Sequence, residues 1–249
     1  MIIVKSPADI EKMSKACKLS AQVLQYAGEQ INAGMSTYEL DKLIYDYIIK
    51  HGGKPNFLNY GGFKGSACIS LNDEVIHGIP DKKKIIRNGD IVSIDVGADI
   101  NGWQGDNAYT FAVGQVSPSA DKLLRVTKEC LSLGIAAARP GNRIGDIGNA
   151  VQTHAEQNGF SVVREYIGHG IGKDLHEDPE VPNYGAKGRG PRLMPGMTIA
   201  IEPMINEGTC SVKVLPDGWT VKTKDGLLSA HFENTIAITQ NGPVILTTV

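Results

Sequence analysis

The stretch Arg87–Asp95, RNGDIVSID, returns in altered form at Met194–Glu202, MPGMTIAIE. In both, a glycine and one further residue precede an apolar run that ends in isoleucine and an acid. The two acids, Asp95 and Glu202, are 107 residues apart (202 − 95). The same offset separates three earlier pairs: Gly34 and Gly141, Leu40 and Ile147, and Gly52 and Gly159. A constant offset over separated segments predicts an internal duplication, with shared turn–helix and turn–strand patterns as the alternative explanation.

The composition is that of a globular protein. Of the 249 residues, 41% are hydrophobic and 21% charged, which is enough for one large core or two small ones. The net charge of −2, without a long basic or acidic block, argues against nucleic acid or membranes as partners. No apolar run could span a bilayer, and the N-terminus lacks the features of a signal peptide. The four cysteines form no CxxC pair, which indicates reduced thiols and a cytoplasmic protein.

Helix and strand signals alternate in two similar blocks. Helices are expected over 6–28, over 36–51, over 117–138 and around 145–157, two of them starting with Ser-Pro. Strands are expected over 67–71, 91–98, 108–113, 198–201 and 228–239. This order predicts an α+β fold in a single domain, 1–249, with repeats over roughly 6–113 and 114–240 related by a pseudo-two-fold axis. The site should lie between the half-sheets, bordered by the glycine-rich loop 183–191.

Five positions together indicate a metal site: Asp95, Asp106, His169, Glu202 and Glu233. Asp95 and Glu202 end apolar runs, where a buried acid is costly unless a cation compensates. Asp95 and Asp106 fall on a predicted hairpin that turns at Asn101-Gly102, so both carboxylates can converge. Glycines flank His169 and were expected to admit a metal or a substrate backbone. Alone, each acid could be a solvent-edge residue and the histidine a surface one; the set carries the interpretation.

Carboxylates with one imidazole suit Mn, Fe, Co or Zn, and the absence of a thiolate ligand disfavours a structural zinc. Two such metals about 3.5–4 Å apart need bridging carboxylates to offset their repulsion. They lower the pKa of a bridging water, so that hydroxide becomes available near neutral pH. A carboxylate at the edge of the site can act as general base, and neutral histidines can stabilise the substrate amide. The pattern therefore predicts a hydrolase with two metals.

Several motifs resemble those of type I methionine aminopeptidases. They are NDEVIHGIP at 72–80, GHGIG at 168–172, HEDP at 176–179, IEPM at 201–204 and DGWT at 217–220. The resemblance covers the chain from about residue 6 to 239, in the family's order and spacing. It implies the pita-bread fold, an internally duplicated structure with a curved antiparallel sheet flanked by helices.

The resemblance also implies roles for individual residues. Asp95 would hold one metal, Asp106 and Glu233 would bridge, and His169 and Glu202 would hold the other metal. Glu202 would also be the general base for the bridging water. His77 would contact the leaving-group side of the amide, and His176 the carbonyl oxygen as it becomes anionic. The methionine pocket would comprise Tyr60, Phe63, Cys68, Tyr166, Leu175 and Trp219. Asn72 and Ser229 match a site for a monovalent cation, Na or K.

The chain departs from the family pattern at five positions, none of them a metal ligand. Phe57 stands where bacterial members often have Cys, Ile76 where Cys or Ala is common, and Leu175 where Phe is frequent. Asn107 follows Asp106 where Ser or Thr is usual, and His231 replaces Gln or Tyr two residues before Glu233. These departures put pocket shape and inhibitor preference in doubt. The pattern otherwise matches the short bacterial form, without an N-terminal zinc-binding extension or a helical insertion.

The expected function is removal of the initiator methionine from nascent proteins and peptides whose second residue is small. A monomer in the cytoplasm, with transient association with the ribosome, is expected on the same grounds. Because Ile2 is bulky, the protein should retain its own Met1. Two alternatives stay open: an Xaa-Pro aminopeptidase or prolidase, which usually carries an extra N-terminal domain, and a non-catalytic pita-bread binding protein, which would have lost ligands.

Overall fold

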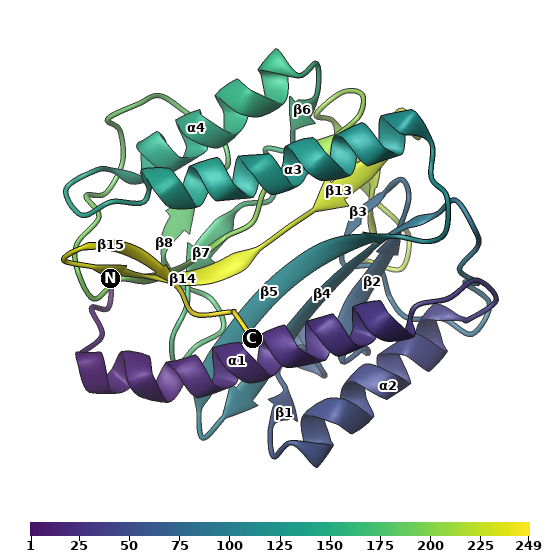
Figure 1. The fold of residues 1–249 in the computed structure, drawn as a ribbon, viewed down its shortest axis with the longest axis horizontal. Helices are drawn as coiled ribbons and strands as arrows, with labels where there is room; N and C mark the ends of the chain where they lie inside the picture. Colours follow the sequence, from purple (N-terminus) through teal and green to yellow (C-terminus); the bar gives the residue numbers. More distant parts are fainter.

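A computed structural model describes residues 1–249 as two helical layers that enclose β-structure. The helices are α1 (Pro7–Gln30), α2 (Thr37–Lys50), α3 (Pro118–Ala137) and α4 (Ile144–Gln157), with a short 3-10 turn at Tyr60–Gly62. Helices α1 and α2 cover the strands on one side and α3 and α4 on the other (Figure 1). No helix is both long enough and apolar enough to cross a membrane.

Strands of the first half form one sheet in the order β1-β4-β2, with β5 beside β4. Their bounds are β1 (Lys54–Pro55), β2 (Ala67–Leu71), β4 (Ile91–Ile100) and β5 (Trp103–Ala112). Strands of the second half form a sheet in the order β15-β14-β9-β7-β8. Their bounds are β7 (Gly168–Gly170), β8 (Glu177–Val181), β9 (Thr198–Ile201), β14 (Asn234–Thr239) and β15 (Gly242–Ile245).

Two three-stranded ladders complete the fold, in the orders β13-β10-β6 and β11-β12-β3. Their strands are β3 (Glu74–Ile76), β6 (Ser161–Val162), β10 (Met204–Asn206), β11 (Val212–Val214), β12 (Val221–Thr223) and β13 (Ser229–His231). The two main sheets meet where Ala108 and Glu233 exchange both backbone hydrogen bonds, at 3.4 and 2.9 Å. This junction brings the middle of β5 next to the chain between β13 and β14.

The helices begin where the sequence predicts. Ser6 and Ser36 accept a hydrogen bond from the backbone of the third helical residue, and Asp9 and Glu39 return one to each cap, which completes two capping boxes. Helix α4 begins and ends 107 residues after α2 (144 − 37 and 157 − 50), and β9 begins 107 residues after β4 (198 − 91). The offset found in the sequence is therefore also the offset between helices and strands in space.

Apolar side chains form two large cores, one on each side of the molecule. One packs α3 and α4 against β9, β14 and neighbouring strands, and the other packs α1 and α2 against β2 and β4. A smaller cluster that includes Phe57, Phe63, Cys68 and Leu175 lies between them. The strands are thus held from both sides, and the space between the two halves is left for a site.

The strand predictions were mostly confirmed, with two errors. Strands 67–71 and 198–201 match, but β5 starts at Trp103 rather than 108, so Asp106 lies inside a strand. The run 228–239 was wrong as one strand: β13 pairs with β10 and β14 with β9, and the chain leaves the ladder at Phe232-Glu233. Loop 183–191 packs on α4, where Gly145 and Gly148 have no side chain to block it. It therefore does not line the candidate site, contrary to the prediction.

Candidate metal centre

The two aspartates are brought together by the β4–β5 hairpin. Asp95 lies opposite Ala108 and Asp106 opposite Gly97 in the antiparallel register, which makes the aspartates diagonal neighbours on one face. The turn is Asn101-Gly102, with φ of 55° and 77°, as a two-residue type I′ turn requires. The sequence prediction that this hairpin lets both carboxylates converge is confirmed.

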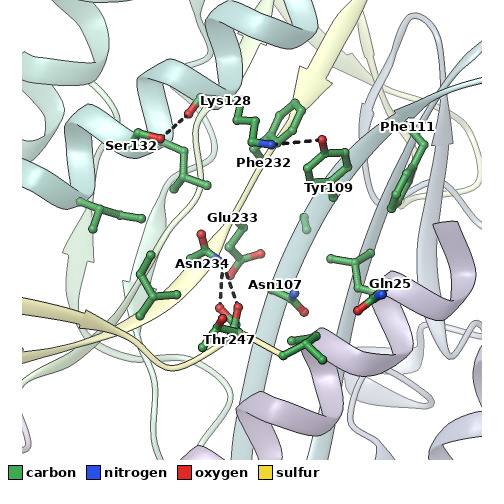
Figure 2. Close-up of a pocket in the computed structure, with 18 residues that line it drawn as sticks. Gln25, Asn107, Tyr109, Phe111, Lys128, Ser132, Phe232, Glu233, Asn234 and Thr247 are labelled. Atoms are coloured by element: carbon green, nitrogen blue, oxygen red, sulfur yellow. Dashed lines mark hydrogen bonds between the residues drawn. The ribbon is translucent and has the colours of Figure 1, made fainter. Parts of the chain in front are cut away.

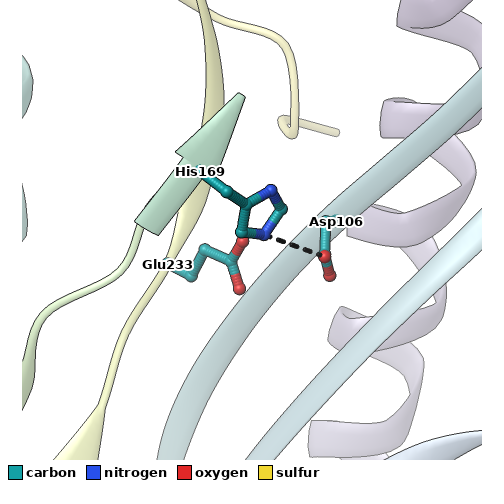
Figure 3. Close-up of side chains that lie close together, drawn as sticks. All are labelled: Asp106, His169 and Glu233. Carbon is teal, nitrogen blue, oxygen red and sulfur yellow. Dashed lines mark ion pairs between the residues drawn. The ribbon is translucent and has the colours of Figure 1, made fainter. Parts of the chain in front are cut away.

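The second half supplies the other three members of the predicted set. His169 is the central residue of β7, Glu202 follows the last residue of β9, and Glu233 follows β13. Side-chain donor atoms of Asp106, His169 and Glu233 lie within 4.8 Å of one another (Figure 3). Nε2 of His169 is 3.9 Å from Oδ2 of Asp106 and 3.5 Å from Oε1 of Glu202. Residues from both halves therefore converge on one point.

The ring of His169 is oriented for ligation. Its Nδ1 lies 2.8 Å from the carbonyl oxygen of Gly170, to which it donates, so Nε2 carries the free lone pair and faces the carboxylates. The neighbouring glycines have another reason than the one expected. A Cβ on Gly168 would lie 2.4 Å from the Ala200 carbonyl oxygen, and one on Gly170 would lie 2.1 Å from that of Asp178. The close approach is by adjacent strands, and not by a metal or a substrate.

The charge balance shows that the cluster fits a cation. Burial, followed by mutual repulsion, raises the pKa of Asp106 and Glu233 well above the ordinary range, and burial likewise raises the pKa of Asp95 and Glu202. One oxygen each of Asp95, Asp106 and Glu233 is buried without a hydrogen-bond partner. Buried, unpartnered carboxylate oxygens are costly unless positive charge compensates them. The donor set, four carboxylates and an imidazole, suits divalent transition metals.

A cavity of about 220 Å³ opens onto this cluster. It is lined by all five predicted ligands, by both predicted substrate histidines and by an apolar wall: Phe57, Tyr60, Phe63, Cys68, His77, Asp95, Asp106, His169, Leu175, His176, Glu202, Trp219 and Glu233. Tyr166 does not line it, and instead packs its ring edge-on against His77 with centroids 5.7 Å apart. Phe57, noted in the sequence only as a departure, is part of the wall.

The two substrate histidines are held neutral and oriented. Burial lowers the pKa of His77 to about 4, and partial burial lowers the pKa of His176. His77 has a positive φ of 57°, and its ring lies edge-on to Trp219. Nδ1 of His176 is 2.8 Å from the hydroxyl of Tyr60. When Tyr60 donates to Nδ1, Nε2–H of His176 is left to donate to a substrate.

The remaining departures fall outside the cavity. The Asn107 side chain points to the other face of β5 from Asp106 and accepts a hydrogen bond from Ser20 of α1. Ile76 is buried against β10 and β12 residues. His231 is buried, with burial lowering the pKa of its imidazole, and its Nε2 is 3.6 Å from Oε2 of Glu202.

The suggested monovalent-cation residues are engaged within the protein. Asn72 donates to Asp90 and accepts from the backbone of Ile91, while Ser229 donates to Asn206. The assignment of a cation to Asn72 and Ser229 stays a prediction.

A second, larger cavity of about 630 Å³ lies between α1 and α3 (Figure 2). Its lining is mainly apolar and includes Tyr109, Phe111, Leu131 and the C-terminal residues Thr247–Val249. Glu233 is its only acidic residue, and it contains no histidine. The groups able to bind a metal and activate water are therefore confined to the smaller cavity.

This fold and this buried cluster define a metallopeptidase. The chain matches the model of metallopeptidase family M24 over residues 11–240. It is 51% identical to a methionine aminopeptidase of Clostridium acetobutylicum over 99% of both chains. It superposes on a methionine aminopeptidase structure from Thermotoga maritima with a TM-score of 0.98 and 47% identity, over 100% of both chains. The chain belongs to family M24 and, within it, to the methionine aminopeptidases. Members of this metallopeptidase family use divalent metal ions.

A more distant structure shows the same fold. A prolidase from Pyrococcus horikoshii aligns with a TM-score of 0.79 at 24% identity, and the match covers 100% of this chain but 64% of the prolidase. The pita-bread fold predicted from the sequence is confirmed by these neighbours.

Proposed function

We propose that the protein removes N-terminal methionine from peptides and nascent chains, with two divalent metal ions held by Asp95, Asp106, His169, Glu202 and Glu233. The observation that carries this proposal is the 220 Å³ cavity, where this cluster faces an apolar wall that contains Phe57, Phe63, Cys68, Leu175 and Trp219. A thioether side chain is apolar and polarizable and suits such aromatic and sulfur-containing surroundings. The methionine would lie against this wall, with its amide towards the carboxylates.

The bound metals supply Lewis acidity and lower the pKa of a water to near neutrality. Glu202 lies at the edge of the cluster and takes a proton from the attacking water as general base. Nε2–H of His176 donates to the carbonyl oxygen as it gains negative charge, with Tyr60 fixing the ring. His77, buried and neutral, contacts the leaving-group side of the amide. Each histidine thus acts through a hydrogen bond rather than through a charge.

The finer features belong to the same proposal. Co, Mn, Fe and Zn all suit the donor set, and metal availability decides among them. We further propose that Asn72 and Ser229 hold a Na or K ion, and that the protein acts as a monomer in the cytoplasm with transient ribosome contact. The two repeats, 6–113 and 114–240, would form one catalytic domain, since the proposed ligands come from both.

The test is a coupled assay for released methionine on metal-stripped protein. After EDTA treatment, Mn²⁺, Fe²⁺ or Co²⁺ is titrated back with Met-Ala-Ser, Leu-Ala-Ser and an Ala-Pro peptide as substrates. Metal-restored release from Met-Ala-Ser alone supports the proposal. Cleavage of the Ala-Pro peptide instead would make the protein a prolidase-type enzyme, and no cleavage by folded, metal-loaded protein would leave a binding protein.

A further inference from the structure

The carboxylate of Glu202 lies between two imidazoles. Oε1 is 3.5 Å from Nε2 of His169, and Oε2 is 3.6 Å from Nε2 of His231. His169 is a proposed metal ligand, whereas the proposed mechanism gives His231 no part. The side chain of His231 is 1% exposed. The two oxygens of Glu202 therefore face different histidines, and one of these histidines has no role yet.

Nε2 of His231 is buried and has no hydrogen-bond partner. A buried polar atom without a partner is costly, so such atoms in a folded protein call for an explanation. The carboxylate oxygen that faces it, Oε2 of Glu202, lies just beyond hydrogen-bonding distance. The arrangement provides a donor and an acceptor that a small rotation of the Glu202 side chain would join.

The backbone of His231 is fixed from two sides. Its N–H donates to Oγ1 of Thr110 at 2.9 Å, and the Thr110 hydroxyl donates back to the His231 carbonyl oxygen at 2.8 Å. Across the ladder His231 pairs with Met204 of β10, two residues after Glu202. The imidazole is thus anchored to β5 and β10, and Glu202 is the partner with freedom to adjust.

The position of His231 favours a donor over a ligand. Donor atoms of Asp106, His169 and Glu233 form a compact group within 4.8 Å, and His231 is not part of it. Its Nε2 faces Oε2 of Glu202, while Oε1 faces His169 of that group. His231 therefore approaches Glu202 through the oxygen that does not face His169.

We propose that His231 is a positioning residue for Glu202: its Nε2–H donates to Oε2 and keeps Oε1 turned towards His169. This inference rests on the proposed function, in which Glu202 is both ligand and general base. Groups that hydrogen-bond a metal ligand fix its orientation, and their loss weakens metal binding or turnover by about 10–100-fold. An amide N–H can make the same hydrogen bond, whereas an alkyl side chain cannot.

The test compares His231→Leu, His231→Gln and His231→Asn with the wild type. Mn²⁺ affinity is measured by calorimetry on EDTA-stripped protein, and kcat and KM are measured on Met-Ala-Ser. His231→Leu is expected to weaken Mn²⁺ binding and lower kcat by about 10–100-fold with little change in KM. His231→Gln should restore most of both, because its amide donates. His231→Asn should behave like His231→Leu because its amide is too short to reach, and it keeps the test open if the leucine variant fails to fold.

His154→Leu is the matched control, because His154 lies on α4, paired with Glu129 away from the cavity. Wild-type Mn²⁺ affinity and kcat in both His231→Leu and His231→Asn would overturn the proposal. Loss of one Mn²⁺ equivalent in His231→Gln would also overturn it, since His231 would then be a ligand. Calorimetry separates the two proposals: if Mn²⁺ binding follows the expected order while even the wild type fails to cleave Met-Ala-Ser, the positioning role stands and the proposed activity fails.

Discussion

Lys5 and Glu177 form an ion pair whose side chains are only 3% and 4% exposed. Oε1 of the same Glu177 accepts hydrogen bonds from the backbone N–H groups of Lys173 and Asp174, at 3.0 and 3.3 Å. The pair therefore ties the N-terminal segment to the loop that leads into His176. Removal of one partner of a buried pair leaves a charge without compensation, which is strongly destabilising.

Lys5→Met is accordingly expected to lower the free energy of unfolding by about 3–5 kcal/mol. Turnover should fall too, because the loop before His176 loses its anchor. Lys12→Met is the control: its pair with Asp9, at 3.8 Å, is largely exposed, so the change should stay within about 0.5 kcal/mol. Urea unfolding of both variants measures the difference, and equal losses would show that the buried pair contributes no more than the exposed one.

Asp41 should make stability depend on pH. Its Oδ1 accepts hydrogen bonds from the backbone of Ser66 and Ala67, at 2.7 and 3.0 Å, and burial raises its pKa from 3.8 to about 6. Between these values the folded state holds more protons than the unfolded chain. The contribution of Asp41 to stability is therefore full below about pH 4 and is lost as the pH rises through about 6.

Asp41→Asn keeps the accepting oxygen but does not titrate. The variant should lose less stability than the wild type between pH 4 and pH 7, measured by urea unfolding at several pH values. Asp46→Asn, at a largely exposed position on the same helix, should keep the wild-type slope. Parallel pH profiles for Asp41→Asn and the wild type would contradict the assignment.

Helix boundaries were the most predictable part of the fold, for a local reason. The caps Ser6, Ser36 and Ser117 accept hydrogen bonds from residues three positions later, so the signal lies within one turn of sequence. Strands such as β3, β6 and β10 are only two or three residues long. Alternation needs four or more residues to be recognised, and these strands are held by partners far away in the sequence.

The metal cluster was predictable because its acids interrupt apolar runs, as Asp95 and Glu202 do. The break at Glu233 was hidden, because β-branched and aromatic residues continue on both sides while the strands join different sheets. His231 was visible only as a departure from a family pattern. Its unpartnered Nε2 depends on where Glu202 lies, which no local signal in the sequence encodes.

Mn²⁺ should stabilise the folded protein, because the cluster of unpartnered carboxylate oxygens exists only in the folded state. At 100 times the dissociation constant, binding contributes about 2.7 kcal/mol, or a rise in Tm of about 5–10 °C for a chain of this size. Asp106→Asn should abolish most of this shift, and Glu156→Gln on the exposed side of α4 should preserve it. Differential scanning fluorimetry with and without EDTA gives the comparison; a full shift in Asp106→Asn would place the metal elsewhere.

Glu202→Gln should separate folding from turnover. Loss of the general base is expected to lower kcat/KM on Met-Ala-Ser by about 10²–10⁴-fold. Without metal the variant should melt no lower than the wild type, because burial raises the pKa of Glu202 and makes its charge unfavourable in the folded state. Glu207→Gln, beyond the end of β10, is the control and should keep its activity. Near-normal kcat/KM in Glu202→Gln would rule out Glu202 as the base.

The small cavity should also restrict the second residue of the substrate. The methionine side chain must fit within about 220 Å³ lined by Phe57, Phe63 and Trp219, which leaves little room for a bulky neighbour. Forcing extra methylene groups into a packed site costs about 1–3 kcal/mol, which corresponds to about 5–150-fold in rate. Two synthetic peptides test this: Met-Ile-Ile-Val-Lys-Ser, the protein's own first six residues, and the same peptide with Ala at position 2. Methionine should be released from the alanine peptide faster by that factor, and intact-mass measurement of the purified protein should show Met1 retained. Equal rates on both peptides would show that the wall of the cavity does not select the second residue.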